Sequence, residues 1–421
     1  MSPRSKILAS WTSALCLALA ASCDTGGGGG STAPAVSARP PLGGPISGLT
    51  ASELAAFQRG KLVFERRFQP SEGLGPRYNT TSCAACHSVP VTGGSAPVYR
   101  NFYIAMLGTA PGPVAPLPGL PSPVVPAYGS GNEFTLEAGR KIIPDDNAGF
   151  GPVTVAQRNS LPLFGVGMFE FVSNATILSR ADPEDLNGDG ISGRFNTDFN
   201  AAVGRFGVKA QSNNVEVFTR APLRNQMGIT SNPFLGSAAV VSASCAAVQV
   251  SADPNLPTVD NDSVQDPEIS AQDLGDLIAF TRFLAPPGRK VPLSAAANRG
   301  EAQFTALGCT KCHVPELPSS RGPVNAYTDL LIHEMGAELA DGLPFGTPQF
   351  SSLSAATAHL EFRTQPLWGV SLSAPFLHDG RAETLHEAIA LHGGEASAIR
   401  DAFLALSASE QADVIEFLEH L

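Results

Sequence analysis

Apolar residues recur at the spacing of an amphipathic helix in four stretches of the chain. The stretches are residues 51–64, 270–284, 384–392 and 407–421. Three of them follow a Ser or Thr that has a Glu three residues later, which is the capping box that opens a helix: Thr50 with Glu53, Thr384 with Glu387, and Ser407 with Glu410. Between the stretches Gly and Pro are frequent, and residues 108–132 carry seven prolines, which excludes a regular helix there. The pattern predicts a mainly α fold with long loop-rich insertions and little β.

Two parts of the chain resemble each other. RGKLVF at residues 59–64 is matched by RGEAQF at 299–304, and SLPLFGVGMFEF at 160–171 is matched by TQPLWGVSLSAPF at 364–376. Such self-similarity predicts a duplicated unit, with large insertions because the two copies lie far apart. We therefore expect one domain over residues 49–285 and a second over residues 286–421.

The beginning of the chain has the pattern of an export signal. A short basic segment precedes an apolar run at residues 7–21, which is too short to span a bilayer. The run ends in AASC, which is similar to the cleavage box of bacterial lipoproteins, and a Gly-rich tether follows. We expect a signal peptide at residues 1–22, lipidation of Cys23 and a tether over residues 23–48; a plain secretory signal cut nearby is the alternative. The mature protein is then exported and anchored to a membrane by lipid, facing the periplasm or the cell exterior.

The composition restricts the partners. The formal net charge is −11, from 27 Lys and Arg against 38 Asp and Glu. A surplus of negative charge repels phosphate backbones and anionic lipid. We therefore expect no nucleic-acid partner, and contact with a membrane only through the lipid anchor.

The strongest chemical signal is a C-x-x-C-H motif that occurs twice. It consists of Cys83, Cys86 and His87 in the first domain, and of Cys309, Cys312 and His313 in the second. Two cysteines at this spacing share one face of a helical turn, where both thiols can bond to the vinyl groups of one haem while the next His binds its iron. Zinc needs four ligands and a redox dithiol needs no His, so both explain the motif less completely. We expect two covalent haem c groups, with His87 and His313 as iron ligands.

Longer motifs resemble those of the bacterial dihaem oxidoreductases, which are described as peroxidases or thiol oxidoreductases and are distant relatives of the dihaem cytochrome c peroxidases. The motifs are GLGPRYNTTSCAACH, DLNGDGISGRFN, GRFGVKA, QMGIT, GCTKCH, YTDLLIHEMG and the run from Arg363 to Ala396. The resemblance implies two cytochrome-c-like haem domains. It also implies two unlike irons, one six-coordinate for electron transfer and one open to a small oxidant.

The second haem has a candidate sixth ligand. In the stretch ETLHEAIALHGG, an apolar face of the expected helix ends in His392. In the related peroxidases the sixth ligand of the C-terminal haem lies fourteen residues after the His of the motif that resembles PFLHDG, and fourteen residues after His378 is His392. We therefore expect His392 to bind the second iron; a hydrogen-bonded core or surface His is the alternative.

The first haem has no such candidate, because no His lies between His87 and His313. We expect a five-coordinate or water-bound iron where peroxide reacts, with Tyr103 and Met106 as alternative weak ligands. Cleavage of peroxide needs a nearby acid–base group. Glu170 lies in the segment that resembles the distal region of the peroxidases, so the resemblance implies Glu170 in that role; a surface or propionate-side carboxylate is the alternative.

A further motif, DLNGDG, matches the start of an EF-hand loop. Asp185, Asn187 and Asp189 take positions 1, 3 and 5, and Gly190 takes position 6. Position 12 is Asn196 instead of Glu, so the bidentate ligand is missing. A calcium site and a tight Asx-rich turn both fit this pattern.

Together these features predict a dihaem c-type oxidoreductase. Electrons would come from a small donor protein, a c-type cytochrome or a cupredoxin, and would pass through the six-coordinate second haem to the first, where peroxide or another small oxidant is reduced. The alternatives are a non-catalytic dihaem electron carrier and an accessory redox protein. A high-spin ferric signal would favour the enzyme, whereas two low-spin haems would favour the carrier.

Overall fold

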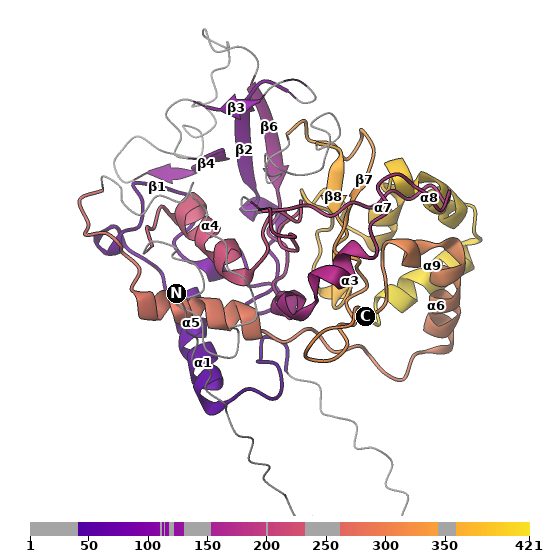
Figure 1. Cartoon of the computed structure of the whole chain (residues 1–421), viewed down its shortest axis with the longest axis horizontal. Coiled ribbons are helices and arrows are strands. Elements are labelled where there is room, and N and C mark those ends of the chain that lie inside the picture. Colours follow the sequence, from indigo (N-terminus) through magenta and orange to yellow (C-terminus); the bar gives the residue numbers. More distant parts are fainter. Residues whose placement is uncertain are drawn as a thin grey trace, which may run out of the picture. The chain divides into compact units, whose positions relative to one another are not determined.

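The structure is a computed structural model (Figure 1) that describes residues 41–109, 112, 114–117, 122–129, 153–198, 201–231, 262–343 and 359–421. The predicted signal peptide, Cys23 and most of the predicted tether lie outside these residues. Export and lipidation therefore remain predictions.

The described helices are compatible with the mainly α prediction. They are α1 (Ala51–Glu65), α3 (Asn174–Leu178), α4 (Val215–Met227), α5 (Ala271–Phe283), α6 (Ala295–Leu307), α7 (Leu385–Ala390), α8 (Ser397–Leu404) and α9 (Ala408–Leu418). The three predicted capping boxes are present at the N-termini of α1, α7 and α9. Because each box satisfies backbone N–H groups that the helix leaves without partners, these local sequences fix where the helices begin.

The sheets are small and antiparallel. The strands are β1 (Arg77–Tyr78), β2 (Phe102–Leu107), β3 (Ala115–Pro116), β4 (Val124–Val125), β5 (Tyr128–Gly129), β6 (Val153–Arg158), β7 (Ile332–Glu334) and β8 (Glu361–Arg363). β2 pairs with β3, β4 and β6 in a four-stranded sheet, whereas β1–β5 and β7–β8 form two-stranded sheets. The described part of the proline-rich segment forms short strands and no helix, as expected.

The helix pairs α1–α5 and α6–α9 repeat one crossing. A Cβ on Gly60 of α1 would come 1.8 Å from the carbonyl oxygen of Asp276 in α5. A Cβ on Gly300 of α6 would come 1.9 Å from the carbonyl oxygen of Asp413 in α9. Only glycine allows backbones to approach this closely.

The side chains next to the two crossings also correspond. Arg59 pairs with Asp276 at 2.7 Å, and Arg299 pairs with Asp413 at 2.6 Å. The predicted duplication of the two RG motifs is thus visible in the structure. The duplication also includes a D-x-I-x-F sequence, which begins at Asp276 in α5 and at Asp413 in α9. This second pair of motifs was not identified from the sequence.

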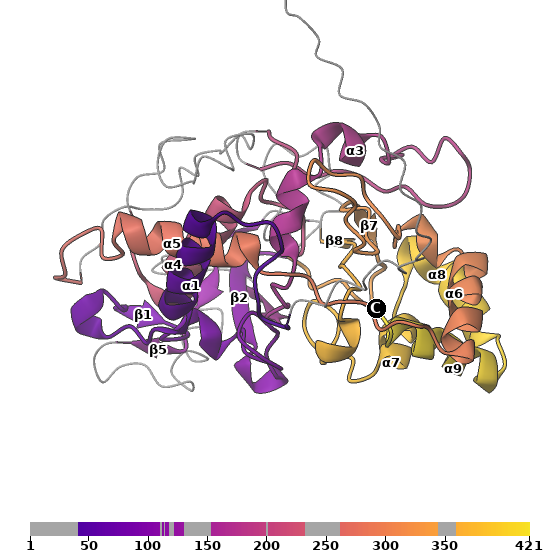
Figure 2. The ribbon, with the colours of Figure 1, turned by 90° about the horizontal axis from the view of Figure 1, so that it is seen from below.

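Two core regions follow from these crossings. The larger contains Phe57, Phe64 and Phe280 of the α1–α5 pair, and the smaller contains Phe304 and Phe417 of the α6–α9 pair. In Figures 1 and 2 the helices α6 to α9 lie together on one side of the described fold, and α1, α4 and α5 lie on the other. The linker between α5 and α6 joins the two groups, close to the predicted boundary between the domains.

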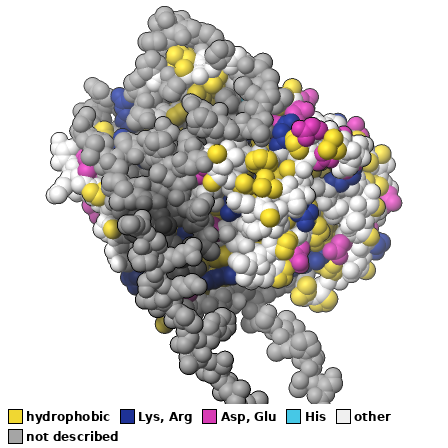
Figure 3. Space-filling model, viewed as in Figure 1, with side chains coloured by type: hydrophobic (Ala, Val, Ile, Leu, Met, Phe, Trp, Pro, Cys, Tyr) yellow, Lys and Arg dark blue, Asp and Glu magenta, His cyan; other side chains and the backbone are white. Residues whose placement is uncertain are grey.

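The surface is mixed in character. On the face drawn in Figure 3, described Lys and Arg side chains are interspersed with Asp, Glu and hydrophobic side chains. None of the helices within the described residues is both long enough and apolar enough to cross a membrane.

Candidate haem site

One cavity connects the two C-x-x-C-H motifs. Its volume is about 1370 Å³, and Cys83, Cys86 and His87 line it together with Cys309, Cys312 and His313. Phe64 of α1 and Phe304 of α6 also line the cavity. Each helix crossing therefore places its own phenylalanine beside its own motif.

The first motif lies in a short turn. The 3-10 turn Cys83–Ala85 begins at Ser82, whose Oγ accepts the N–H of Ala85 at 3.2 Å. Nδ1 of His87 lies 3.2 Å from the carbonyl oxygen of Gly94. Because a carbonyl oxygen only accepts, Nδ1 carries the proton. The His87 ring also has a backbone hydrogen bond with Leu161.

The second motif repeats this arrangement. The 3-10 turn Cys309–Lys311 follows Gly308, which ends α6 with a φ of 94°. Nδ1 of His313 donates to the carbonyl oxygen of Tyr327 at 2.9 Å. The Phe304 and His313 ring centroids are 6.3 Å apart, against 6.2 Å for Phe64 and His87, so the two sites have nearly the same proximal geometry.

Burial shifts the pKa of cysteines and histidines in both motifs. Burial lowers the pKa of both His87 and His313 to about 4, so the imidazoles are neutral, which is the form that binds metal. Burial raises the pKa of Cys83 and of Cys309 to about 12.

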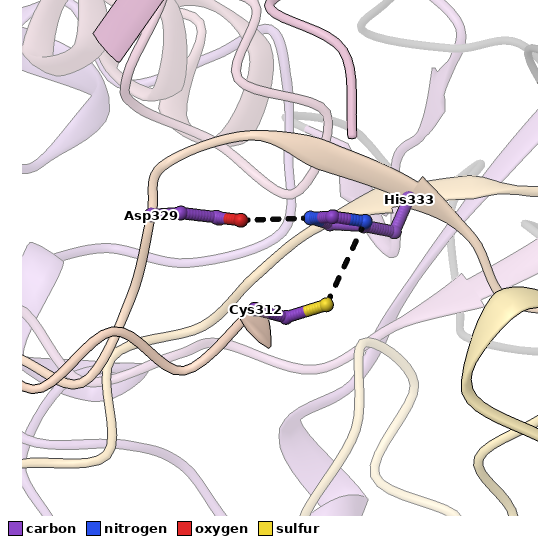
Figure 4. Close-up of side chains that lie close together, drawn as sticks. All are labelled: Cys312, Asp329 and His333. Carbon is purple, nitrogen blue, oxygen red and sulfur yellow. Dashed lines mark hydrogen bonds and ion pairs between the residues drawn. The ribbon is translucent and has the colours of Figure 1, made fainter. Parts of the chain in front are cut away.

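No cluster of possible metal ligands within the described residues combines both cysteines of one motif. The one group of His, Cys and carboxylate atoms close enough to hold an ion there is Cys312, Asp329 and His333, which leaves out Cys309 (Figure 4). The four motif cysteines form no disulfide.

Arginine side chains line the cavity; of these, Arg158 pairs with Asp341 and Arg400 pairs with Asp401. Five arginines and no Asp or Glu line it among the described residues: Arg100, Arg158, Arg224, Arg363 and Arg400. A haem carries two propionate carboxylates, which need cationic or hydrogen-bonding partners when they are buried. The volume, the turns, the proximal histidines and the arginines together fit two haem groups.

His392 lines the same cavity, after the apolar face of α7. Its Nδ1 donates to the carbonyl oxygen of Ala388 at 2.7 Å, which leaves Nε2 for a ligand. Burial lowers the pKa of His313 most, and His392 and His333 lower it further. His392 thus lies at the same cavity as His313, and its role as an iron ligand stays a prediction.

Residues 147–421 match the model of a protein family described as "Di-haem oxidoreductase, putative peroxidase". The match covers more than half of the chain. The chain belongs to the di-haem oxidoreductases. The first C-x-x-C-H motif precedes the matched residues and is assigned from its own geometry. Among the curated proteins, none matches this di-haem oxidoreductase.

Several solved structures are similar to this di-haem oxidoreductase. The diheme peroxidase BthA from Burkholderia thailandensis shares 17% identity, with 87% of this chain and 86% of that chain covered and a TM-score of 0.43. A MauG-like protein associated with microbial copper homeostasis shares 16%, with 91% and 92% covered and a TM-score of 0.41. Hydrazine synthase from Kuenenia stuttgartiensis shares 15%, with 90% of each chain covered and a TM-score of 0.38. At these values the likenesses carry no argument about activity.

The first site of the di-haem oxidoreductase differs from the second. Among the alternative weak ligands, Met106 lines the cavity, whereas Tyr103 is not among the lining residues and packs with Leu117 and Val125. Successive strand residues point to opposite faces, which explains why two residues of β2 separate in this way. His378 also lines the cavity. Its ring stacks on that of Phe362, with 4.1 Å between the two ring centroids.

Glu170 has a different environment from the one predicted. It is buried, its Oε1 accepts the N–H of Val215 at 2.7 Å, and its Oε2 accepts a hydrogen bond from Nε of Arg282 at 2.5 Å. Glu170 is not among the residues that line the cavity. Its contacts therefore give it a structural role at the N-terminus of α4, and the acid–base role has no support from the cavity.

The predicted calcium loop closes on itself. Asp185 accepts the N–H groups of Asp189 and Gly190 at 2.9 Å and 3.1 Å, respectively, as in an Asx-rich turn. Oδ2 of Asp189 lies 3.1 Å from Nζ of Lys311, inside the second C-x-x-C-H motif. Asn187 accepts the N–H of Asp189 at 2.9 Å. The loop is thus tied to the second haem site, and the calcium prediction stays open.

Sequence reasoning missed two kinds of residue. It did not assign the arginines of the cavity wall, because an isolated Arg in a loop carries no pattern. It also passed over Glu395, which accepts four hydrogen bonds beside the second site. Glu395 follows the paired glycines after His392, and such glycines indicate close backbone packing that could have drawn attention to it.

Proposed function

We propose that this di-haem oxidoreductase carries two covalent haem c groups and is peroxidase-like, with electrons passing from the second haem to the first. One observation carries the proposal. Both motif histidines and His392 line a single cavity, and Nδ1 of each is engaged by a backbone carbonyl. His392 and His333 act on the pKa of His313, whereas no histidine is among the causes that shift the pKa of His87. A closed second iron and an accessible first iron follow from this asymmetry.

The chain supplies attachment, orientation and charge. Cys83 and Cys86 hold the first haem, and Cys309 and Cys312 hold the second. When bound, the haems supply electron transfer and reaction with peroxide. The carbonyl groups of Gly94 and Tyr327 fix the protonated Nδ1 of the two proximal histidines and raise the basicity of Nε2. The cavity arginines balance the propionates, and the apolar side chains of α4 and α7 exclude water.

Two cytochrome-c-like domains underlie this arrangement. The α1–α5 and α6–α9 crossings are the evidence, since each places an Arg–Asp pair, a glycine contact and a phenylalanine at corresponding positions beside one motif. The domains are residues 49–285 and 286–421.

The protein is exported and is anchored by lipid on Cys23. Support comes from the signal pattern at residues 1–22 and from the haem c motifs, since covalent haem is attached outside the cytoplasm. A Cys23→Ala variant expressed in a competent host tests this. The holoprotein is expected in the soluble extracytoplasmic fraction, and its retention in the membrane would contradict the anchor.

The electron donor is a small c-type cytochrome or cupredoxin, and the oxidant is peroxide or a similar small molecule. The excess of acidic residues supports a donor with basic charge around its redox centre and opposes nucleic acid as a partner.

Calcium binds the loop at Asp185, Asn187 and Asp189. The motif spacing supports this, and the Lys311–Asp189 pair connects the loop to the second haem site. Removal of calcium by chelation is expected to lower the thermal midpoint of the holoprotein, and the midpoint of Asp189→Asn is expected to be insensitive to chelation. Equal midpoints with calcium and with chelator in the unaltered protein would contradict the site.

A second candidate function is non-catalytic electron transfer. The cavity lining favours it. No carboxylate among the described residues lines the cavity, and Glu170 is bound to Arg282 instead. The accessory redox protein is a variant of this alternative.

Rapid mixing of the fully reduced holoprotein with hydrogen peroxide separates the two functions. If the protein is a peroxidase, two electrons are expected to leave the haems for each peroxide reduced. The observed rate of haem oxidation should then rise in proportion to the peroxide concentration. A carrier would be oxidised slowly and without this stoichiometry, which would overturn the peroxidase proposal while leaving the two haems in place.

A further inference from the structure

The segment that carries His392 is fastened to β7 by one carboxylate. Oε1 of Glu395 accepts the N–H of Glu334 at 3.1 Å and the hydroxyl of Ser192 at 2.9 Å. Oε2 accepts the N–H of Ser192 at 2.9 Å and lies 2.9 Å from Nδ1 of His333. Four donors from two separated parts of the chain, Ser192 and the β7 residues His333 and Glu334, thus converge on Glu395.

The paired glycines after His392 allow this contact. Gly394 has a φ of 52°, and a Cβ on it would come 2.1 Å from the carbonyl oxygen of Glu334. A Cβ on Gly393 would come 2.7 Å from the carbonyl oxygen of Met335. The backbone after His392 is therefore pressed against the end of β7, independently of the Glu395 side chain.

β7 is in turn connected to the attachment point of the second haem. Nε2 of His333 lies 2.9 Å from Oδ2 of Asp329, and Nδ1 lies 3.7 Å from Sγ of Cys312 (Figure 4). Burial lowers the pKa of His333, but Asp329 and Cys312 together outweigh burial and raise it well above its ordinary value. Both ring nitrogens of His333 lie 2.9 Å from carboxylate oxygens, which only accept, so the ring donates to Asp329 and to Glu395, and its side chain is only 4% exposed.

These contacts form a chain from Cys312 through His333 and Glu395 to the turn after His392. A second bond holds the same turn, since Nη1 of Arg400 donates to the carbonyl oxygen of His392 at 3.0 Å. Buried bonds to a charged group are stronger than neutral ones and are costly to break. The side chain of Glu395 is 8% exposed, so water competes little for these donors.

We propose that Glu395 is a positioning residue that fixes His392 as the sixth ligand of the second haem by tying its segment to β7 and to Ser192. The inference rests on the proposed function, in which His392 binds that iron. Glu395 does not touch the ligand atom. It lowers the frequency with which the His392 segment leaves the iron.

Carbon monoxide binding to the fully reduced holoprotein measures this release. The open first haem binds in a fast phase, and the second binds in a slow phase limited by dissociation of His392. Glu395→Gln keeps the shape of the side chain but loses the charge and half of its acceptors. It is expected to speed the slow phase about tenfold, which is the lower end of what losing an outer-shell partner costs. The matched control is Glu383→Gln, the same change at an exposed site in the preceding loop, and it should keep the unaltered rate.

The variant His392→Ala distinguishes a wrong ligand assignment from a wrong positioning role for Glu395. It should convert the slow phase into a second fast phase. If His392→Ala leaves both phases unchanged, the proposed ligand is wrong. If it removes the slow phase while Glu395→Gln retains the unaltered rate, the positioning role is overturned and the proposed function stands.

Ser192→Ala covers the case in which Glu395→Gln does not yield folded holoprotein. It removes one donor to Glu395, and the slow phase is expected to accelerate by about threefold, in keeping with the loss of one hydrogen bond. An unaltered rate in Ser192→Ala would then overturn the role of Glu395.

Discussion

Gly300 of α6 lies against the backbone carbonyl of Asp413 in α9, at a distance that leaves no room for a Cβ. Gly60 and Asp276 repeat this relationship in the other half. At both crossings an arginine next to the glycine pairs with the same Asp. The two C-x-x-C-H motifs are therefore set at corresponding places by corresponding backbone contacts, and the proposed asymmetry of the irons depends on what lies across the cavity.

Substitution of Gly300 tests whether the close contact between α6 and α9 stabilises the fold. Gly300→Ala forces α6 and α9 apart, and we expect the free energy of unfolding to fall by about 3 kcal/mol, as for overpacking of a tight contact. Denaturant unfolding followed by circular dichroism measures the change. Ala302→Ser on the exposed face of the same helix is the control, expected within about 0.5 kcal/mol of the unaltered protein. Equal stability of Gly300→Ala would show that the crossing is not tight.

A substitution at Glu170 tests whether this carboxylate has a structural or a catalytic role. In Glu170→Gln, Arg282 loses a buried carboxylate partner, so we expect the free energy of unfolding to fall by about 3 kcal/mol. The rate of peroxide reaction per intact haem is expected to stay unchanged. Unaltered stability with a large loss of that rate would restore Glu170 as the acid–base group.

The pH dependence of stability reports on Glu395. Burial raises its pKa, but hydrogen bonds and charge from His333, with the bonds from Glu334 and Ser192, outweigh this and hold it at about 2. In the unfolded chain a Glu titrates near pH ~4.3, so the unfolded state binds more protons between these values. The stabilisation, about 3 kcal/mol at most, is present above pH ~4.3 and is lost as the pH falls towards 2.

Acid unfolding of the Glu395→Gln variant isolates this contribution. Its stability is expected to fall less steeply over the same pH range, because the titrating group is gone. A variant whose acid transition has the same slope as that of the unaltered protein would show that Glu395 is not the source.

The cysteines of the two motifs make a separate prediction. The double variant Cys83→Ala, Cys86→Ala is expected to retain one covalent porphyrin, carried by the second motif, and the corresponding double variant at Cys309 and Cys312 is expected to retain the other. Mass spectrometry of the denatured proteins counts the attached groups. Two attached porphyrins in either double variant would refute the assignment.

The sequence predicted the elements whose signals are local. The capping boxes at Thr50, Thr384 and Ser407 gave the starts of three helices, since a cap depends on residues within one turn. The face of α7 that leads to His392 also lies where the helical period places it, at the cavity. The two motifs and the repeated RG contacts are likewise short-range patterns.

The missed features depend on contacts between distant residues. The four-stranded sheet pairs β2 with β6 across a long insertion, and no local period gives that partner. Glu170 was assigned from its neighbours in sequence, whereas its partner Arg282 lies 112 residues further on. Glu395 likewise meets Ser192 across 203 residues, so its role becomes visible only in the fold.

Electron paramagnetic resonance of the oxidised holoprotein, with and without His392→Ala, tests the central claim most directly. The claim predicts one high-spin and one low-spin iron in the unaltered protein, and two high-spin irons in the variant. Two low-spin irons in the unaltered protein, or a low-spin signal that survives the loss of His392, would contradict it.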